Sequence, residues 1–152
     1  MDSNNLNNPK IIKIGRINPH DQQLLIEREH KTIKFYTISL IIAIILFWTI
    51  AGIVIAFALF IVRKKELAKL KLLEAGTIDL YKVKGTLSIK AGADIPFYYI
   101  DGYRLPYDYL YKVDKYKGQT ITVEFYPKIF AIRCHYDVDG NGYNYISRTE
   151  IS

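Results

Sequence analysis

The chain has 152 residues, half of which are hydrophobic, and a formal net charge of +6. Residues 1–34 carry an excess of two positive charges, residues 63–76 an excess of three, and residues 77–152 an excess of one. The C-terminal half is therefore almost neutral, which argues against nucleic acid as a partner because phosphate-backbone binding needs a basic surface. Cys134 is the only cysteine, so an intramolecular disulfide is excluded.

The N-terminal 18 residues are polar and rich in asparagine, apart from isoleucines between positions 11 and 17. We expect residues 1–18 to be disordered or to form a short extended segment, because they offer little apolar surface to bury. Asn18-Pro19 predicts a helix start, since asparagine caps helix N-termini and proline suits the first helical position. A pre-membrane helix is therefore predicted over residues 19–34.

The most distinctive feature is an apolar segment at residues 35–62, which contains no charged residue, no proline and a single glycine, Gly52. At about 1.5 Å per residue, a helix of this length exceeds the roughly 30 Å apolar core of a bilayer. It is too short to cross twice, because each crossing needs about 20 apolar residues. The sequence thus predicts one transmembrane helix at 35–62. A buried core helix and a cleavable signal peptide are the disfavoured alternatives.

The residues that follow this segment predict its orientation. Arg63, Lys64 and Lys65 mark an expected membrane boundary, and they open a basic juxtamembrane helix over residues 63–76 that ends at Gly76. More positive charges flank the C-terminal side than the N-terminal side, which favours a cytoplasmic C-terminal domain in a bacterial inner membrane. The lipid bilayer is then one partner. The small residues Ala51, Gly52 and Ala56 also suggest a homo-oligomer formed through the transmembrane helix.

From Thr77 onward the pattern is typical of short strands, because Thr, Ile, Val, Tyr and Phe dominate and turn signals recur. Asp101-Gly102 predicts a two-residue hairpin turn, Pro127-Lys128 separates two strands expected to pair, and residues 107–113 suit a short helical turn. We predict a membrane-anchored α+β protein, with one transmembrane helix followed by a small all-β barrel-like (OB/SH3-like) domain at 77–152. This arrangement resembles the small β domains that follow transmembrane segments in bacterial membrane proteins.

Two patterns suggest chemistry in this domain. Asp137, Asp139 and Asn141 have the spacing that opens a calcium-binding loop. The twelfth position of that loop, which should be glutamate, is Arg148, so this is a weak candidate and no metal site is assigned. Cys134-His135 offers a nucleophile beside a base, but neighbours in a strand point to opposite faces. We therefore predict a non-enzymatic protein without a cofactor.

Tyrosine is concentrated in this domain, since twelve of the thirteen tyrosines lie at or after position 81. Tyrosine is enriched at protein interfaces because it combines a large apolar ring with a polar hydroxyl. The expected partner-binding residues are those around the first hairpin: Tyr98, Tyr99, Tyr103, Tyr107, Tyr109 and Tyr111.

These features favour a single-pass membrane protein whose tyrosine-rich domain binds a protein partner. Two roles fit this expectation, namely an accessory or regulatory subunit of a membrane complex and a membrane-anchored immunity protein that neutralises a toxin. The alternative is an outward-facing domain that senses a ligand or a glycan, which requires the opposite orientation. An enzyme would need a pocket with at least two facing titratable groups.

Overall fold

The computed structural model describes residues 10–46, 50–92, 96–106 and 113–151. The chain divides into two compact units, a helical unit at 18–77 and a β unit formed by residues 1–17 with 78–152. The β unit is therefore built from both ends of the sequence, because the helical unit is inserted between its first and second strands.

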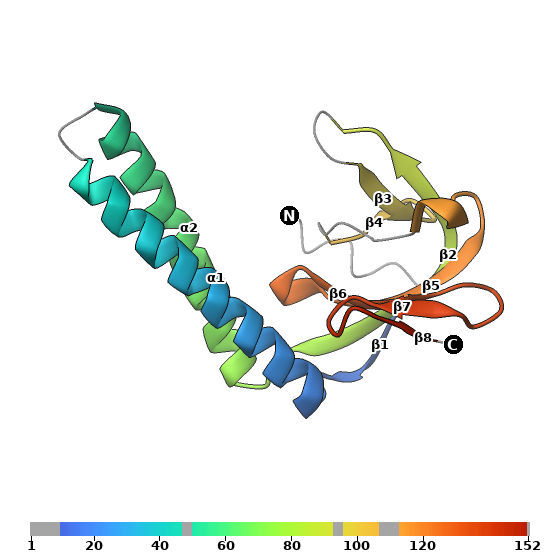
Figure 1. The fold of residues 1–152 in the computed structure, drawn as a ribbon. Coiled ribbons are helices and arrows are strands. Elements are labelled where there is room, and N and C mark those ends of the chain that lie inside the picture. The colour runs from blue at the N-terminus through green and yellow to red at the C-terminus, as the bar shows by residue number, and fades with distance from the viewer. Residues whose placement is uncertain (1–9, 47–49, 93–95, 107–112, 152) are drawn as a thin grey trace. The chain divides into compact units, whose positions relative to one another are not determined.

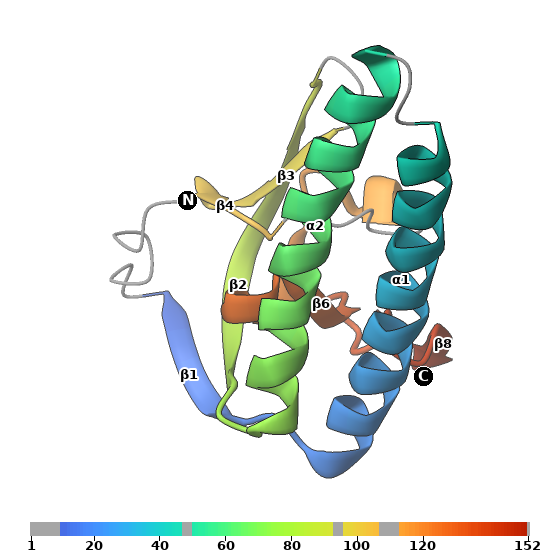
Figure 2. The same ribbon diagram turned by 90° about the vertical axis from the view of Figure 1, so that its left-hand side faces the viewer.

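The helical unit is a hairpin of two antiparallel helices, α1 (Pro19–Ile45) and α2 (Ile50–Glu74), which lie side by side in Figures 1 and 2. Leu25 and Leu73 are 1% and 0% exposed and form its packed end, where Gln22 Nε2 donates to the Leu73 carbonyl at 2.6 Å. Further along, Arg63 Nε donates to Thr37 Oγ1 at 3.0 Å. The two helices are thus joined by apolar packing and by hydrogen bonds across the hairpin.

The ends of this hairpin confirm two sequence predictions. Asn18 caps α1, its side chain accepting the Asp21 backbone N–H at 2.7 Å, and Pro19 occupies the first helical turn. Gly76, with φ of +61°, follows α2 and donates its N–H to the Leu73 carbonyl at 3.0 Å. Glycine adopts this left-handed conformation without a Cβ penalty, which explains why α2 ends there.

The predicted single transmembrane helix at 35–62 is wrong, because this segment belongs to two helices. Among the described residues, no helix is both long enough and apolar enough to cross a membrane. Each helix is apolar over only part of its length, since charged residues occupy the first half of α1 and the second half of α2. No glycine or proline marks the end of α1. The apolar pattern alone therefore did not show that the chain reverses direction between α1 and α2.

Because the chain reverses direction between α1 and α2, its predicted placement as a single-pass inner-membrane protein is not supported. Without a single transmembrane helix at 35–62, the proposed boundary at Arg63, Lys64 and Lys65 stays a prediction. Arg63 bonds to α1 through Thr37, whereas Lys64 and Lys65 are exposed on α2. Antiparallel pairing of the two apolar halves is a tertiary interaction, which a count of consecutive apolar residues does not detect.

A buried carboxyl group makes the hairpin sensitive to pH. Glu29, 7% exposed on α1, has its pKa raised from 4.5 to about 7 by burial and then by the hydrogen bond and charge of Glu66, with Lys69 opposing. The folded hairpin therefore holds a proton that the unfolded chain releases above pH 4.5. The stability that this protonated carboxyl contributes is fully present below pH 4.5 and is lost as the pH rises through 7.

We expect Glu29→Gln to remove most of this pH dependence and to stabilise the hairpin at pH 8. Urea unfolding followed by far-ultraviolet circular dichroism at pH 5 and pH 8 measures the effect. Glu27→Gln, at an exposed position on the same helix, is the matched control and should keep the wild-type dependence. Equal pH dependence in both variants would contradict the role of Glu29.

The β unit is one open antiparallel sheet. Its strands are β1 (Ile11–Arg16), β2 (Asp79–Lys90), β3 (Phe97–Ile100), β4 (Tyr103–Arg104), β5 (Thr120–Tyr126), β6 (Ala131–Tyr136), β7 (Gly142–Asn144) and β8 (Thr149–Ile151). Their order is β4-β3-β2-β5-β6-β7-β8, and β1 pairs with β2 beside this path. The short 3-10 helices η2 (Val113–Tyr116) and η3 (Pro127–Ile129) precede β5 and β6.

The residues in the turns determine how several neighbouring strands of this sheet are connected. Asp101 and Gly102 have φ of 45° and 83° and join β3 to β4 with Ile100 opposite Tyr103, which confirms the predicted hairpin. Pro127 and Lys128 separate the paired strands β5 and β6, as expected. The segment Ile11–Arg16 forms β1, which pairs with β2, in line with the short extended segment that was one of the two alternatives for residues 1–18.

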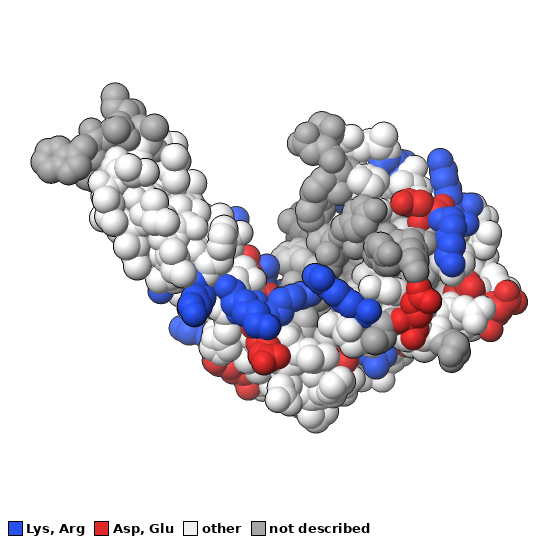
Figure 3. Space-filling model, viewed as in Figure 1, with Lys and Arg blue, Asp and Glu red and all other residues white. Residues whose placement is uncertain are grey.

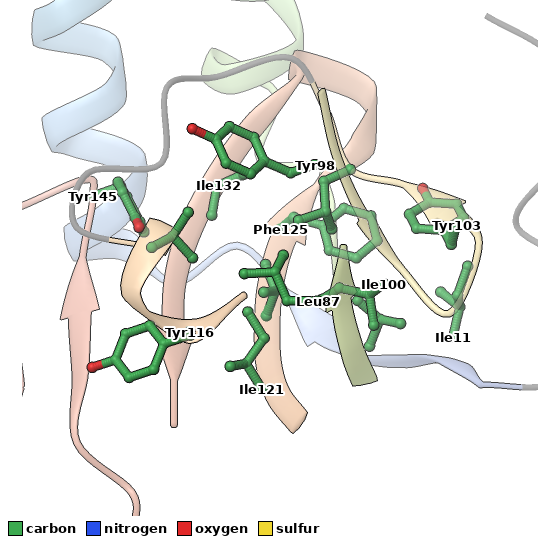
Figure 4. Packing of buried hydrophobic residues seen from close by; sticks show 14 residues of the cluster. Ile11, Leu87, Tyr98, Ile100, Tyr103, Tyr116, Ile121, Phe125, Ile132 and Tyr145 are labelled. Atoms are coloured by element: carbon green, nitrogen blue, oxygen red, sulfur yellow. The ribbon is translucent and has the colours of Figure 1, made fainter. Parts of the chain in front are cut away.

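The predicted barrel-like closure is wrong, because the sheet is open. Among the described residues its outermost strands are β4, which pairs with β3, and β8, which pairs with β7. These strands have two and three residues, so they offer too few backbone groups to close a barrel. The core instead lies against the sheet around Phe125, with Leu87, Ile100 and Ile132 among its members (Figure 4).

Candidate functional site

The six tyrosines expected to bind a partner do not form one exposed surface in the described residues. Tyr98 and Tyr103 are 4% and 8% exposed, and their rings point into the core near Phe125 (Figure 4). Tyr99 is half-buried on β3, and Lys90 Nζ lies 4.9 Å from its ring centroid. Tyr107, Tyr109 and Tyr111 lie outside the described residues. A partner-binding role for the set stays a prediction, although two of its rings are core residues.

The weak calcium candidate forms a hydrogen-bonded turn. One carboxylate oxygen of Asp137 accepts the backbone N–H groups of Asp139 and Asn141 at 3.0 and 2.8 Å. Asp139 and Asn141 are exposed at the tip of this turn. Within the described part of the chain, no three His, Cys, Asp or Glu side chains are grouped in a way that would hold a metal ion. The Asp137 carboxylate therefore organises the connection from β6 to β7.

Cys134 and His135 on β6 have different surroundings, as expected for neighbours in a strand. Burial raises the pKa of the Cys134 thiol to about 12, so the group is a poor nucleophile at neutral pH. Its Sγ lies 3.3 Å from Glu124, which pairs with Arg133 at 2.5 Å. His135 instead bonds through Nδ1 to the Tyr145 hydroxyl at 2.8 Å. The thiol has no imidazole base beside it.

The outer half of the helical hairpin presents an exposed apolar surface. Thirteen large apolar residues of α1, α2 and the α1 cap are 39% to 69% exposed there, and no charged residue occurs between positions 35 and 62. Figure 3 shows this part of the hairpin without blue or red side chains. We call these residues the apolar hairpin end: Phe35, Ile38, Ile41, Ile42, Ile44, Ile45, Leu46, Ile53, Val54, Ile55, Phe57, Phe60 and Ile61.

A groove of about 310 Å³ runs along this surface between the two helices. The buried residues Ala43 and Gly52 contribute to it, and Ile42 and Ile55 border it while being more than half exposed. Small side chains let another helix approach closely, and larger ones beside them form ridges. The groove therefore has the shape and chemistry to receive an apolar helix.

No protein-family model, curated protein sequence or solved structure matches this chain. The sequence predicts Ala51, Gly52 and Ala56 as a contact for a second helix. In the folded chain Gly52 is buried in the hairpin, and the groove beside it also includes Ser39, Ile42 and Leu59. Gly52 therefore lies beside residues of α1 in the same chain, which the sequence pattern did not predict.

Proposed function

We propose that this chain is a protein-binding module, and that it assembles with a second copy of itself through the apolar hairpin end. The observation that carries the proposal is the exposure of thirteen large apolar residues on one segment free of charged residues. The accessory-subunit and immunity roles both need a protein-docking surface. Self-assembly is the form of docking that this hairpin supports best.

The size of the surface favours a stable interface. At roughly 80 Å² of exposed apolar area per residue, the apolar hairpin end amounts to on the order of 1,000 Å². The largest apolar patch on a typical monomer is about 300–600 Å², and a standard protein interface buries about 800 Å² per partner. Leaving this area in water is unfavourable, so a partner that covers it stabilises the complex.

A second copy satisfies the chemistry of the surface. A two-fold interface brings the same patch of both subunits together, so each copy offers the other an equally apolar face. Residues 35–62 contain no charge, and their contact therefore creates no like-charge repulsion. Exposed ridges such as Ile42 and Ile55 on one copy match the groove floored by Ala43 and Gly52 on the other.

Co-expression of two full-length copies with different affinity tags tests this assembly. We expect the two copies to purify together and to sediment at a multiple of the monomer mass. The double variant Ile42→Glu/Ile55→Glu should weaken association at least a hundredfold, because burying unpaired carboxylates costs several kcal/mol. Circular dichroism would verify that the helices remain folded.

Ile12→Glu is the matched control, since Ile12 is 60% exposed on β1 and lies outside the hairpin. It should leave association unchanged. A wild-type chain that is monomeric at micromolar concentration would overturn the proposal. Monomers that bind lipid vesicles, or equal loss of association in the control, would do the same.

A further inference from the structure

A second feature, independent of the hairpin, lies in the β unit. A cavity of about 320 Å³ is bordered by η2, β6, β7, β8 and the turn between β6 and β7. This volume is at the lower end of the range for small-molecule sites, roughly 300–1,000 Å³. Its lining combines aromatic rings with side chains of both charges: Lys115, Tyr116, His135, Asp137, Tyr143 and Glu150.

Strand register places three of these residues in a row. His135 on β6 is opposite Tyr143 on β7, and Tyr143 is opposite Glu150 on β8. Directly opposite residues of antiparallel strands have side chains on the same face, about 5 Å apart at Cβ. Asp137 follows His135 by two positions and also borders the cavity. The cavity wall therefore runs from an imidazole through a phenol ring to a carboxylate.

The imidazole is fixed in position and keeps one nitrogen for a ligand. His135 is 1% exposed, its Nδ1 lies 2.8 Å from the Tyr145 hydroxyl, and the Tyr116 ring packs edge-on at 5.3 Å between centroids. Its other nitrogen, Nε2, makes no hydrogen bond with the described residues, and His135 borders the cavity. A buried ring nitrogen of this kind benefits from a polar ligand group.

The charges around the cavity have opposite signs. Lys115 Nζ lies 4.7 Å from the centroid of the Tyr116 ring, on η2. Asp137 is held by the turn after β6, where one of its oxygens accepts two backbone N–H groups, and Glu150 lies on β8. The lining thus offers one ammonium group and two carboxylates on separate elements. A ligand with a single charge would meet a like charge as well as an opposite one.

We propose that this cavity binds a small zwitterion of the amino-acid type. The ligand's ammonium group lies toward Asp137 and Glu150, and its carboxylate lies toward Lys115. An apolar or aromatic ligand side chain packs beside Tyr116 and Tyr143, whose rings add cation–π attraction for the ammonium group. His135 Nε2 supplies a hydrogen bond and orients the ligand.

Three probes that share one phenyl group and differ in charge test this proposal: L-phenylalanine, phenethylamine and 3-phenylpropionate. Binding to the full chain at pH 7 is measured by calorimetry and by the NMR signals of the His135 ring. L-phenylalanine should bind at least tenfold more tightly than either probe with one charge and should shift the His135 signals. Lys115→Met should remove the preference for L-phenylalanine over phenethylamine.

Lys117→Met is the matched control, because Lys117 is exposed two residues later and does not border the cavity. Asp137→Asn keeps an oxygen for the turn and should reduce binding of phenethylamine and L-phenylalanine alike. The proposal is overturned if phenethylamine or 3-phenylpropionate binds as tightly as L-phenylalanine. It is also overturned if no probe shifts the His135 signals, or if both lysine variants bind like the wild type.

Discussion

Gly142→Ala is expected to destabilise the β unit by at least 3 kcal/mol. Gly142 begins β7 opposite Tyr136, and a Cβ at this position would run into the backbone carbonyl oxygen of His135. A backbone atom in a paired strand has little room to move, so β6 and β7 would have to separate locally. Large losses of stability are expected when a side chain is added where two backbone segments lie close together.

Urea unfolding of the full chain, followed by the NMR signals of β-unit residues, measures this loss. Gly15→Ala is the matched control, since nothing lies within 4 Å of a Cβ built on Gly15 in β1. That control should change the free energy of unfolding by less than about 1 kcal/mol. Similar stability of the two variants would show that β7 accepts a side chain at position 142.

Local signals in the sequence predicted those features that depend on a few neighbouring residues. The Asn18 side chain caps α1, and Asp101-Gly102 forms the turn between β3 and β4. Each feature depends only on the backbone conformation of the residues that form it. In contrast, the reason for a glycine at position 85 is not local. Gly85 lies inside the twelve-residue β2, and the Asp101 side chain occupies the space where a Cβ would lie. This glycine reflects a contact with a residue 16 positions away, which no local pattern in the sequence reveals.

The burial of two of the six predicted tyrosines could not be read from the sequence for a related reason. Tyr98 and Tyr103 share a tyrosine-rich segment with Tyr99. Side chains along β3 alternate between the two faces of the sheet, and the turn at Asp101 sets the facing of β4, so Tyr98 and Tyr103 lie in the core. Composition could not separate buried rings from exposed ones. The cavity beside His135 depends on three strands and η2, so no spacing in the sequence could bring Lys115, Tyr143 and Glu150 together.

His135 is expected to make the β unit sensitive to acid. Its pKa is lowered from 6.5 to about 4, chiefly by burial and then by the charge of Lys115, while Asp137 opposes this shift. Below pH 6.5 the unfolded chain binds a proton that the folded chain does not accept until about pH 4. The stability is therefore complete above pH 6.5 and falls by about 3 kcal/mol as the pH drops to 4.

Unfolding free energies of the β unit measured between pH 7 and pH 4 test this expectation. His135→Asn should lower stability at pH 7, because it removes the ring from its contacts with Tyr116 and Tyr145, but it should flatten the pH dependence. His20→Asn, exposed at the start of α1, should leave that dependence as in the wild type. An unchanged pH dependence of stability in His135→Asn would contradict the role of His135.

The two units should respond to acidification with opposite signs, because Glu29 makes the helical hairpin more stable in acid whereas His135 makes the β unit less stable. One pH titration therefore separates their contributions.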